Sequence, residues 1–294
     1  MANPTHHGVT AAEKETFQRD GYHVARGLLS REEAAQWREH FMGIHAAGPV
    51  AGYFDPKPLD QTNADMLQSY PRMLNPHRWN EVAKGKMLDS RLEGVLQSLL
   101  DETPLAAQSM FYFKPPGARG QALHQDDFYL KSRPGHCMAA WFALDDTDAG
   151  NGGLFVVPGS HTLPILCPHA ADLRHSFTIE EVDVPPGMTP VPVNLAAGDV
   201  LFFNGAVIHG SEPNVSTDRF RCSFICHYVG QSTESMAAWY NPVWTFDGQP
   251  VNMDVEDGGG PCGTEGLAAL REGLLAQGEL ARVGQEQGAI ALPV

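Results

Sequence analysis

The chain lacks a long apolar run, an excess of basic residues and an export signal. No stretch of its 294 residues approaches 18 consecutive apolar residues, so we predict no membrane-spanning helix. Residues 1–7 have neither the basic start nor the apolar core of a signal peptide, which favours a cytoplasmic location. The net charge is −15, from 20 basic and 35 acidic residues, whereas a surface that binds nucleic acid needs a basic excess. We therefore expect a protein that binds neither membranes nor nucleic acid.

Cysteine is scarce and irregularly spaced. Five cysteines, an odd number, suit the reduced thiols of a cytoplasmic protein better than a disulfide framework. Cys222 and Cys226 are four residues apart, but no second Cys or His pair completes four ligands, so we predict no zinc site there. The acidic charge would suit a cationic substrate, although solubility is the simpler explanation.

Helical signals dominate the first hundred residues. Two capping boxes, in which Ser or Thr is followed three residues later by Glu, predict helix starts at Thr10 and Ser30. The first helix is expected to end at Asp20-Gly21, before a short strand at 22–25, and the second covers 34–44. Residues 48–76 are rich in proline and glycine and are interpreted as an irregular lid or binding loop. Helical spacing returns over 79–100 and predicts one further helix.

From residue 105 the pattern changes to short strands. Turn signals rich in glycine and proline separate the predicted strands, which cover 105–114, 139–144, 154–157, 191–193, 200–203 and 221–228. Many short strands with regular punctuation favour a mainly β fold, namely a jelly roll (a cupin-like double-stranded β-helix) flanked by helices. We interpret the chain as one domain, with a helical part and lid over about 10–104, a core over about 105–230 and a C-terminal extension over 231–294. That extension includes a predicted helix at 264–275.

Three residues in this core have the chemistry of a metal site. His124 and Asp126 are two residues apart, and in an extended strand their side chains would share one face. A His-x-Asp sequence alone is common by chance, but His209 can supply a third ligand. Two histidines and one carboxylate on one side of a metal form the facial triad of non-haem Fe(II) oxygenases.

A basic residue follows at a spacing that suits a bound carboxylate. Arg221 and Ser223 stand two residues apart on a predicted strand, twelve residues after His209. A buried guanidinium binds a carboxylate through two hydrogen bonds, and a hydroxyl adds a third. In isolation the pair would more often be a surface arginine on a strand. Beside a predicted metal site it favours a binding site for the distal carboxylate of 2-oxoglutarate.

The ordered set of motifs resembles the phytanoyl-CoA dioxygenase family of Fe(II)- and 2-oxoglutarate-dependent oxygenases. The similarity covers most of the chain from Phe17 to Tyr228. Beyond an opening at 17–33, its motifs are Lys114-Pro115-Pro116, Leu123-His124-Gln125-Asp126, Ala140-Trp141, Asn151-Gly152-Gly153, Val157-Pro158-Gly159-Ser160-His161, Ala197-Gly198-Asp199-Val200 and His209-Gly210-Ser211-Glu212-Pro213-Asn214. Each motif is weak alone, and their order makes the set specific.

The resemblance implies a role for each matching position. It implies that His124, Asp126 and His209 bind Fe(II), and that 2-oxoglutarate and O₂ are co-substrates. The remaining matches imply 2-oxoglutarate contacts, namely Arg221, Ser223, Gln125, Trp141 and Met110. The family arginine usually follows the distal histidine by about eleven residues, and here Arg219 and Arg221 stand at ten and twelve. We favour Arg221, because Tyr228 keeps its register with that residue.

The resemblance also implies the type of reaction. Related halogenases replace the carboxylate ligand with a small residue, so the presence of Asp126 favours hydroxylation or another C–H oxidation with release of succinate and CO₂. Asp127 would point to the opposite face and is interpreted as structural.

The identity of the substrate is not encoded in any motif. We expect a small organic molecule, and the candidate residues at the rim of the site are Tyr70, Arg72, His77, Tyr129 and Lys131. Two alternatives remain open, a cupin-type metalloenzyme that does not use 2-oxoglutarate and a non-catalytic binding module. The C-terminal extension could cap the barrel or a second copy of the chain, so a homodimer is a candidate assembly.

Overall fold

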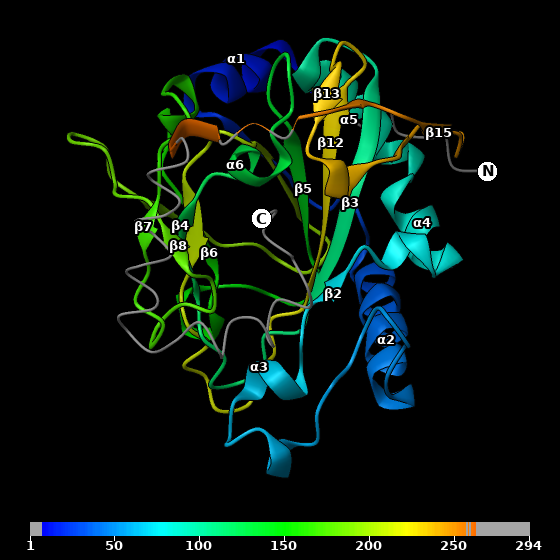
Figure 1. The fold of residues 1–294 in the computed structure, drawn as a ribbon, viewed down its shortest axis with the longest axis vertical. Coiled ribbons are helices and arrows are strands. Elements are labelled where there is room, and N and C mark those ends of the chain that lie inside the picture. Colours follow the sequence, from blue (N-terminus) through cyan, green and yellow to red (C-terminus); the bar gives the residue numbers. More distant parts are fainter. Residues whose placement is uncertain (1–7, 257, 259, 263–294) are drawn as a thin grey trace.

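Two β-sheets face one another and helices cover the outer side of the larger sheet (Figure 1). The computed structural model describes residues 8–256, 258 and 260–262. The larger sheet has the order β1-β10-β5-β12-β3-β14-β15, with β2 also paired to β3, and the smaller has the order β4-β11-β6-β9. Two further pairs, β13-β16 and β7-β8, lie outside these sheets.

The strands are short and those of both large sheets pair antiparallel, as a jelly roll requires. In the larger sheet the strands are β1 (Tyr22–Ala25), β2 (Met73–Leu74), β3 (Pro104–Tyr112), β5 (Met138–Ala143), β10 (Val200–Asn204), β12 (Ser223–Gly230), β14 (Val243–Trp244) and β15 (Pro250–Val251). In the smaller sheet they are β4 (Gln121–His124), β6 (Leu154–Val156), β9 (Val191–Val193) and β11 (His209–Ser211). The remaining strands are β7 (His169–Ala170), β8 (Glu180–Glu181), β13 (Ser235–Met236) and β16 (Asp254–Val255). The predicted mainly β fold is confirmed.

The helices begin where the capping signals place them. Both predicted capping boxes form, with Thr10 and Ser30 as N-caps of α1 (Ala11–Asp20) and α2 (Arg31–Ala47). The single helix predicted over 79–100 is wrong. Asp89 accepts a hydrogen bond from the Arg91 backbone N–H and starts a new helix, so the segment divides into α4 (Glu81–Met87) and α5 (Ser90–Leu100).

Short helical turns occupy several of the connections. Within the predicted irregular segment these are η1 (Leu59–Gln61) and α3 (Met66–Ser69), followed by η2 (Pro76–Arg78). Further along the chain they are α6 (Asp127–Leu130), η3 (Ala149–Asn151), η4 (Ser160–Thr162), η5 (Ala238–Tyr240) and η6 (Gly260–Cys262).

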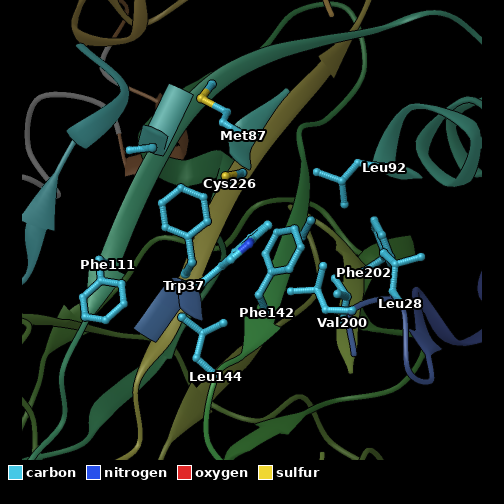
Figure 2. Packing of buried hydrophobic residues seen from close by; sticks show 14 of the residues in the cluster. Leu28, Trp37, Met87, Leu92, Phe111, Phe142, Leu144, Val200, Phe202 and Cys226 are labelled. Carbon is cyan, nitrogen blue, oxygen red and sulfur yellow. The ribbon is translucent and has the colours of Figure 1, made fainter. Parts of the chain in front are cut away.

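Successive side chains along each strand point to opposite faces of the sheet, so the large sheet contributes to two separate apolar cores. The outward face of the large sheet packs on the helices, where Trp37 of α2 lies against Phe142 (Figure 2). Phe41 of the same helix stacks on Phe224. The inward face meets the small sheet in a second apolar cluster, which comprises Ala139, Trp141, Ala143, Leu154, Val156, Val193, Leu195, Leu201, Phe203, Val207 and Ile225. Polar side chains that share this inward face therefore lie between the two sheets.

The expectation that all five cysteines are reduced is wrong. Cys167 and Cys262 form a disulfide, because the fold brings the C-terminal segment back to a loop 95 residues earlier in the chain. Cys137, Cys222 and Cys226 are buried free thiols. The helix predicted at 264–275 lies outside the described residues. No helix in the described part of the chain has the length and apolar character to cross a membrane.

Candidate active site

The three predicted metal ligands converge between the sheets. His124 ends β4 and stands directly opposite His209, the first residue of β11, in the antiparallel pair of these strands. Their ring centres are 4.1 Å apart, and the Asp126 Oδ1 atom lies 3.4 Å from His124 Nε2 and 3.7 Å from His209 Nε2. All three residues are buried, and one ligand atom from each lies within 4.8 Å of the others. The donor set fits a ferrous ion, since imidazole nitrogen and carboxylate oxygen both suit that metal.

Asp126 reaches this cluster by a different route from the one the sequence suggested. The residue is not extended, with φ −63° and ψ −34°, and it occupies the position before the first turn of α6. The strand therefore ends at His124, and the chain turns into a helix to bring the carboxylate back toward the imidazole. The premise that both side chains lie on one face of a strand is wrong, although the side chains meet.

Backbone contacts orient both imidazoles. His124 Nδ1 lies 2.8 Å from the carbonyl oxygen of Ala122, and His209 Nδ1 lies 3.0 Å from that of Val207. A carbonyl only accepts hydrogen bonds, so each Nδ1 carries a proton and each Nε2 is the nitrogen directed at the cluster. The Gln121 side-chain amide nitrogen lies 3.0 Å from His124 Nε2, so a metal would take the place of that contact. Burial lowers the pKa of His209 to about 4, so its imidazole is neutral at pH 7.

The carboxylate is in its ligand form as well. Burial opposes ionisation of Asp126, but the neighbouring imidazoles of His209 and His227 and the hydrogen bonds it receives hold its pKa well below its usual range. His227 of β12 contributes one of these bonds, with Nε2 2.9 Å from Asp126 Oδ2. An ionised carboxylate beside two imidazole nitrogens is a donor set that suits a divalent cation.

A cationic pocket adjoins the cluster. The Arg221 guanidinium is 3% exposed and donates from Nε to the Gly152 carbonyl oxygen at 3.1 Å and from Nη1 to Ser223 Oγ at 2.9 Å. It lies over the Trp141 ring, 5.3 Å from the ring centre. Gly152 has φ +79°, and a Cβ atom there would collide with the Lys114 side chain, so this position needs glycine.

Lys114 brings a second buried cation into the same pocket. Its ammonium donates to Ser211 Oγ at 2.9 Å, and burial with the nearby Arg221 holds its pKa well below the usual range. Burial also lowers the pKa of Arg221 to about 10. Neither cation forms an ion pair with a carboxylate within the described residues. Two buried cations without an anionic partner fit a carboxylate ligand such as the distal end of 2-oxoglutarate.

Arg219 and Arg221 are clearly separated by their surroundings. Arg219 is on the surface and binds Asp148 through two hydrogen bonds of 2.7 and 2.9 Å. Arg221 lines a cavity with Tyr112 and Lys114. The geometry therefore supports the choice of Arg221.

The other residues implied to contact 2-oxoglutarate divide into two groups. Trp141 stacks beneath Arg221, and Met110 accepts a contact of 3.6 Å from the Tyr112 hydroxyl beside the same cavity. The Gln125 amide is instead used by the backbone, since it donates to the Ala206 carbonyl oxygen at 2.8 Å and accepts from the Leu166 N–H at 2.8 Å. Gln125 thus fixes the loops on either side of the ligands.

The five substrate candidates also separate. Arg72 and Tyr70 line the same cavity as Arg221, and the Tyr129 ring lies 6.3 Å from the His124 ring. His77 is buried away from these groups, with Nδ1 2.7 Å from Ser109 Oγ. Lys131 donates to the Gly258 carbonyl oxygen at the surface. The structure therefore brings three of the five near the ligand cluster and its adjoining pocket.

Lys114, Ser211 and His227 were not singled out as site residues from the sequence. Lys114 begins a family motif and has φ +37°, a rare conformation for a side chain with a Cβ, but φ is not visible in a sequence. Ser211 follows His209 by two residues on β11, and this spacing could have indicated it. Asp127 is buried and bonds Ser132, Arg133 and His136, in agreement with its expected structural role.

A jelly roll with a buried His-Asp-His cluster beside a cationic pocket defines the class of Fe(II)- and 2-oxoglutarate-dependent oxygenases. Residues 17–222 match the family model described as phytanoyl-CoA dioxygenase. The chain belongs to this family, and it is an oxygenase that uses iron and 2-oxoglutarate.

Relatives of the chain cover most of its length. A Bos taurus protein named phytanoyl-CoA dioxygenase domain-containing protein 1 is 33% identical, with 75% of this chain and 90% of that protein aligned. The ectoine dioxygenase of Stutzerimonas stutzeri (strain A1501) is 25% identical over 81% of this chain and 83% of that one. The crystal structure of EctD from S. alaskensis with 2-oxoglutarate and 5-hydroxyectoine has a TM-score of 0.63 at 21% identity, covering 87% of this chain and 90% of that chain. The last similarity supports the fold.

Proposed function

We propose that the enzyme hydroxylates, or otherwise oxidises at a C–H bond, a small organic molecule, with His124, Asp126 and His209 holding the iron. The observation that carries this proposal is the approach of the His124 and His209 imidazoles to the ionised Asp126 carboxylate within a buried space. For hydroxylation the balance is substrate plus 2-oxoglutarate plus O₂ to hydroxylated product, succinate and CO₂. When bound, the ferrous ion supplies the oxidising chemistry.

The chain itself supplies position and charge. Arg221 and Ser223 would bind the distal carboxylate of 2-oxoglutarate, with Lys114 and Ser211 completing the polar end of the pocket. Trp141 and the neighbouring apolar cluster exclude water around the ligand, which strengthens these charged contacts. No described residue is needed as a general acid or base, because the reaction transfers no proton to the protein.

The substrate would enter beside the segment that contains α3. Arg72 donates to the Tyr112 hydroxyl at 3.2 Å and lies over the Phe177 ring, and Tyr70 stacks on His45 near the same cavity. These residues, with Tyr129 beside His124, are proposed to contact the substrate. His77 and Lys131 are assigned to packing and to the surface instead. A small substrate is consistent with the molecules named for the related solved structures, such as 5-hydroxyectoine.

The two alternatives predict different uses of Arg221. A cupin-type enzyme that does not use 2-oxoglutarate gives no role to the buried Arg221 guanidinium, and a non-catalytic binding module gives no role to the convergence of two imidazoles and a carboxylate. Neither alternative is favoured by a contact in the described residues.

The decisive experiment is anaerobic addition of Fe(II) and then 2-oxoglutarate to the purified apoprotein. We expect the weak visible absorption band of a metal-chelated 2-oxo acid, followed by succinate formation when O₂ is admitted. Arg221→Ala should require much more 2-oxoglutarate to produce the same band. A protein that binds Fe(II) but gives neither band nor succinate would contradict the proposal.

The assembly and location are also proposed. We propose one oxygenase domain, supported by the pairing of β1 from the N-terminal part with β10 of the core. The cytoplasm is supported by three buried free thiols, while the Cys167–Cys262 disulfide argues against it, and thiol labelling in cell extracts would decide. A homodimer remains a prediction to be tested by sedimentation, since residues 263–294 lie outside the described part.

A further inference from the structure

His227 is a buried histidine whose contacts are directed at the metal cluster. It lies on β12, 1% exposed, where the side chains of Ser223, Ile225 and His227 face the small sheet. The register between β12 and β3 shifts between His227 and Tyr228, and such bulges redirect side chains. Its Nε2 lies 2.9 Å from Asp126 Oδ2, while its Nδ1 is buried with no hydrogen-bond partner among the described residues.

The unpaired nitrogen shows that packing does not explain this histidine. A buried polar atom without a partner costs about 1–3 kcal/mol, and an apolar residue would avoid that cost on a strand whose neighbouring residues, Ile225 and Val229, are buried and apolar. The ionised carboxylate of Asp126 can only accept hydrogen bonds. His227 Nε2 therefore carries a proton and donates a hydrogen bond to Asp126 Oδ2. The bond to Asp126 is therefore the contact that accounts for an imidazole at this position.

The two oxygens of Asp126 have separate surroundings. Oδ1 faces the Nε2 atoms of His124 and His209, whereas Oδ2 faces His227. An aspartate at a helix N-cap commonly accepts a hydrogen bond from the first turn, but the Asp126 side chain receives none from α6. The orientation of this carboxylate therefore depends on the imidazole across the sheet interface.

We propose that His227 is a positioning residue that limits Asp126 to one metal-binding oxygen. Carboxylates bind metals through one or both oxygens. An aspartate that bound the metal through both oxygens would occupy a position that the co-substrates 2-oxoglutarate and O₂ would need, so holding Oδ2 on His227 would keep that position open. The inference rests on the proposed function, because it concerns the metal centre assigned there.

The test compares three substitutions at one position with a control on the same strand. His227→Gln places an amide N–H near the position of Nε2, His227→Asn carries the same amide one methylene short, and His227→Phe keeps the ring without a donor. Cys226→Ala changes the adjacent residue, which packs in the opposite core. Each apoprotein is titrated with Co(II) by calorimetry, and the anaerobic Fe(II)–2-oxoglutarate absorption band is recorded.

We expect the Co(II) dissociation constant to rise about 10- to 100-fold in His227→Asn and His227→Phe, as for other lost partners of metal ligands. The 2-oxoglutarate band should weaken or shift in the same two variants. His227→Gln should recover most of the affinity, and Cys226→Ala should match the wild type. Circular dichroism verifies that each variant folds. If His227→Phe does not fold, His227→Asn alone tests whether the lost hydrogen bond weakens metal binding.

The outcomes separate the two proposals. If the wild type binds Co(II) tightly and His227→Asn has the same Co(II) affinity and absorption band, the role of His227 is overturned and the proposed metal centre stands. Weakened binding in His227→Gln equal to that in His227→Asn would also overturn it, since the donor would then have no effect. A wild-type protein that binds no Co(II) would overturn the proposed metal centre and this inference with it.

Discussion

The two faces of the large sheet are both buried, yet they differ in where their polar groups find binding partners. On β12, Phe224, Cys226 and Tyr228 face the helices, and the Tyr228 hydroxyl donates to the Met87 carbonyl oxygen at 2.7 Å. On the other face, Ser223 and His227 lead to metal ligands and buried cations. The Tyr228 hydroxyl on the helix-covered face finds its partner within the chain, whereas the inner face presents charged groups and metal-ligand atoms to a ligand. Burial alone therefore does not distinguish residues that stabilise the fold from residues that serve chemistry.

Removing a metal ligand should affect the chemistry of the inner face more strongly than the fold. We expect Asp126→Ala to lower 2-oxoglutarate-dependent succinate formation on the order of 10⁴-fold, as for residues at the centre of a catalytic unit. The melting temperature of the apoprotein should fall modestly, because the buried His227 imidazole loses the acceptor of its hydrogen bond. Succinate assays and calorimetry measure both quantities, and activity within tenfold of the wild type would contradict the assignment.

The opposite result is expected on the helix-covered face. Phe224 is fully buried, with ring centres 5.2 Å from Phe41 and 6.0 Å from Trp37. Phe224→Ala should lower the free energy of unfolding by about 3–5 kcal/mol through the cavity it leaves. Co(II) affinity of the folded variant should be unchanged. Urea denaturation and calorimetry check this pair of results, and a large loss of metal affinity would show that the two faces are coupled.

Arg221 and Arg219 form a matched pair that tests the cationic pocket. Arg221→Gln should weaken 2-oxoglutarate binding by about 2–3 kcal/mol, roughly 30- to 150-fold, because a buried contact to a carboxylate is lost. Arg219→Gln removes a surface bond to Asp148 and should leave the affinity unchanged. Anaerobic titration of the absorption band measures both. Equal effects of the two substitutions would mean that the anchor is wrongly assigned.

The smallest expected effect is the pH dependence of stability due to His77, a buried histidine that is not one of the metal ligands. Burial lowers its pKa to about 3, below the value of 6.5 in an unfolded chain, so the unfolded state binds the proton more tightly. Stability is therefore lost as pH falls below about 6.5. From pH 7 to 5 the wild type should lose about 2 kcal/mol more than His77→Gln. Urea unfolding at both pH values measures this difference, and parallel losses in the two proteins would exclude it.

Local signals in the sequence predicted local structure well. The capping boxes at Thr10 and Ser30 each satisfy backbone donors within one turn, so three or four neighbouring residues determine where α1 and α2 begin. The division between α4 and α5 was missed because the apolar spacing continues through Leu88, while the N-cap at Asp89 depends on a local side-chain hydrogen bond. Many short strands separated by regular turn signals indicated the jelly roll, although these signals do not specify which strands pair.

Contacts between distant segments were the part that could not be predicted. The pairing of Cys167 with Cys262 follows from the path of the C-terminal segment, which no spacing encodes. The hydrogen bond from His227 to Asp126 joins β12 of the large sheet to the start of α6, and a histidine within an apolar strand gives no sign of its partner. The ligand types of the site were predicted from the sequence, and the groups that orient them required the structure.

The cross-strand register of β4 and β11 has a consequence for the order of maturation. His124 and His209 come from segments far apart in the chain and meet only when these two strands align residue for residue. A slip by one residue would turn one imidazole to the opposite face and leave the ion without its second nitrogen. We therefore expect high-affinity metal binding only after β4 and β11 have paired, so metal affinity would report on the native register of these two strands.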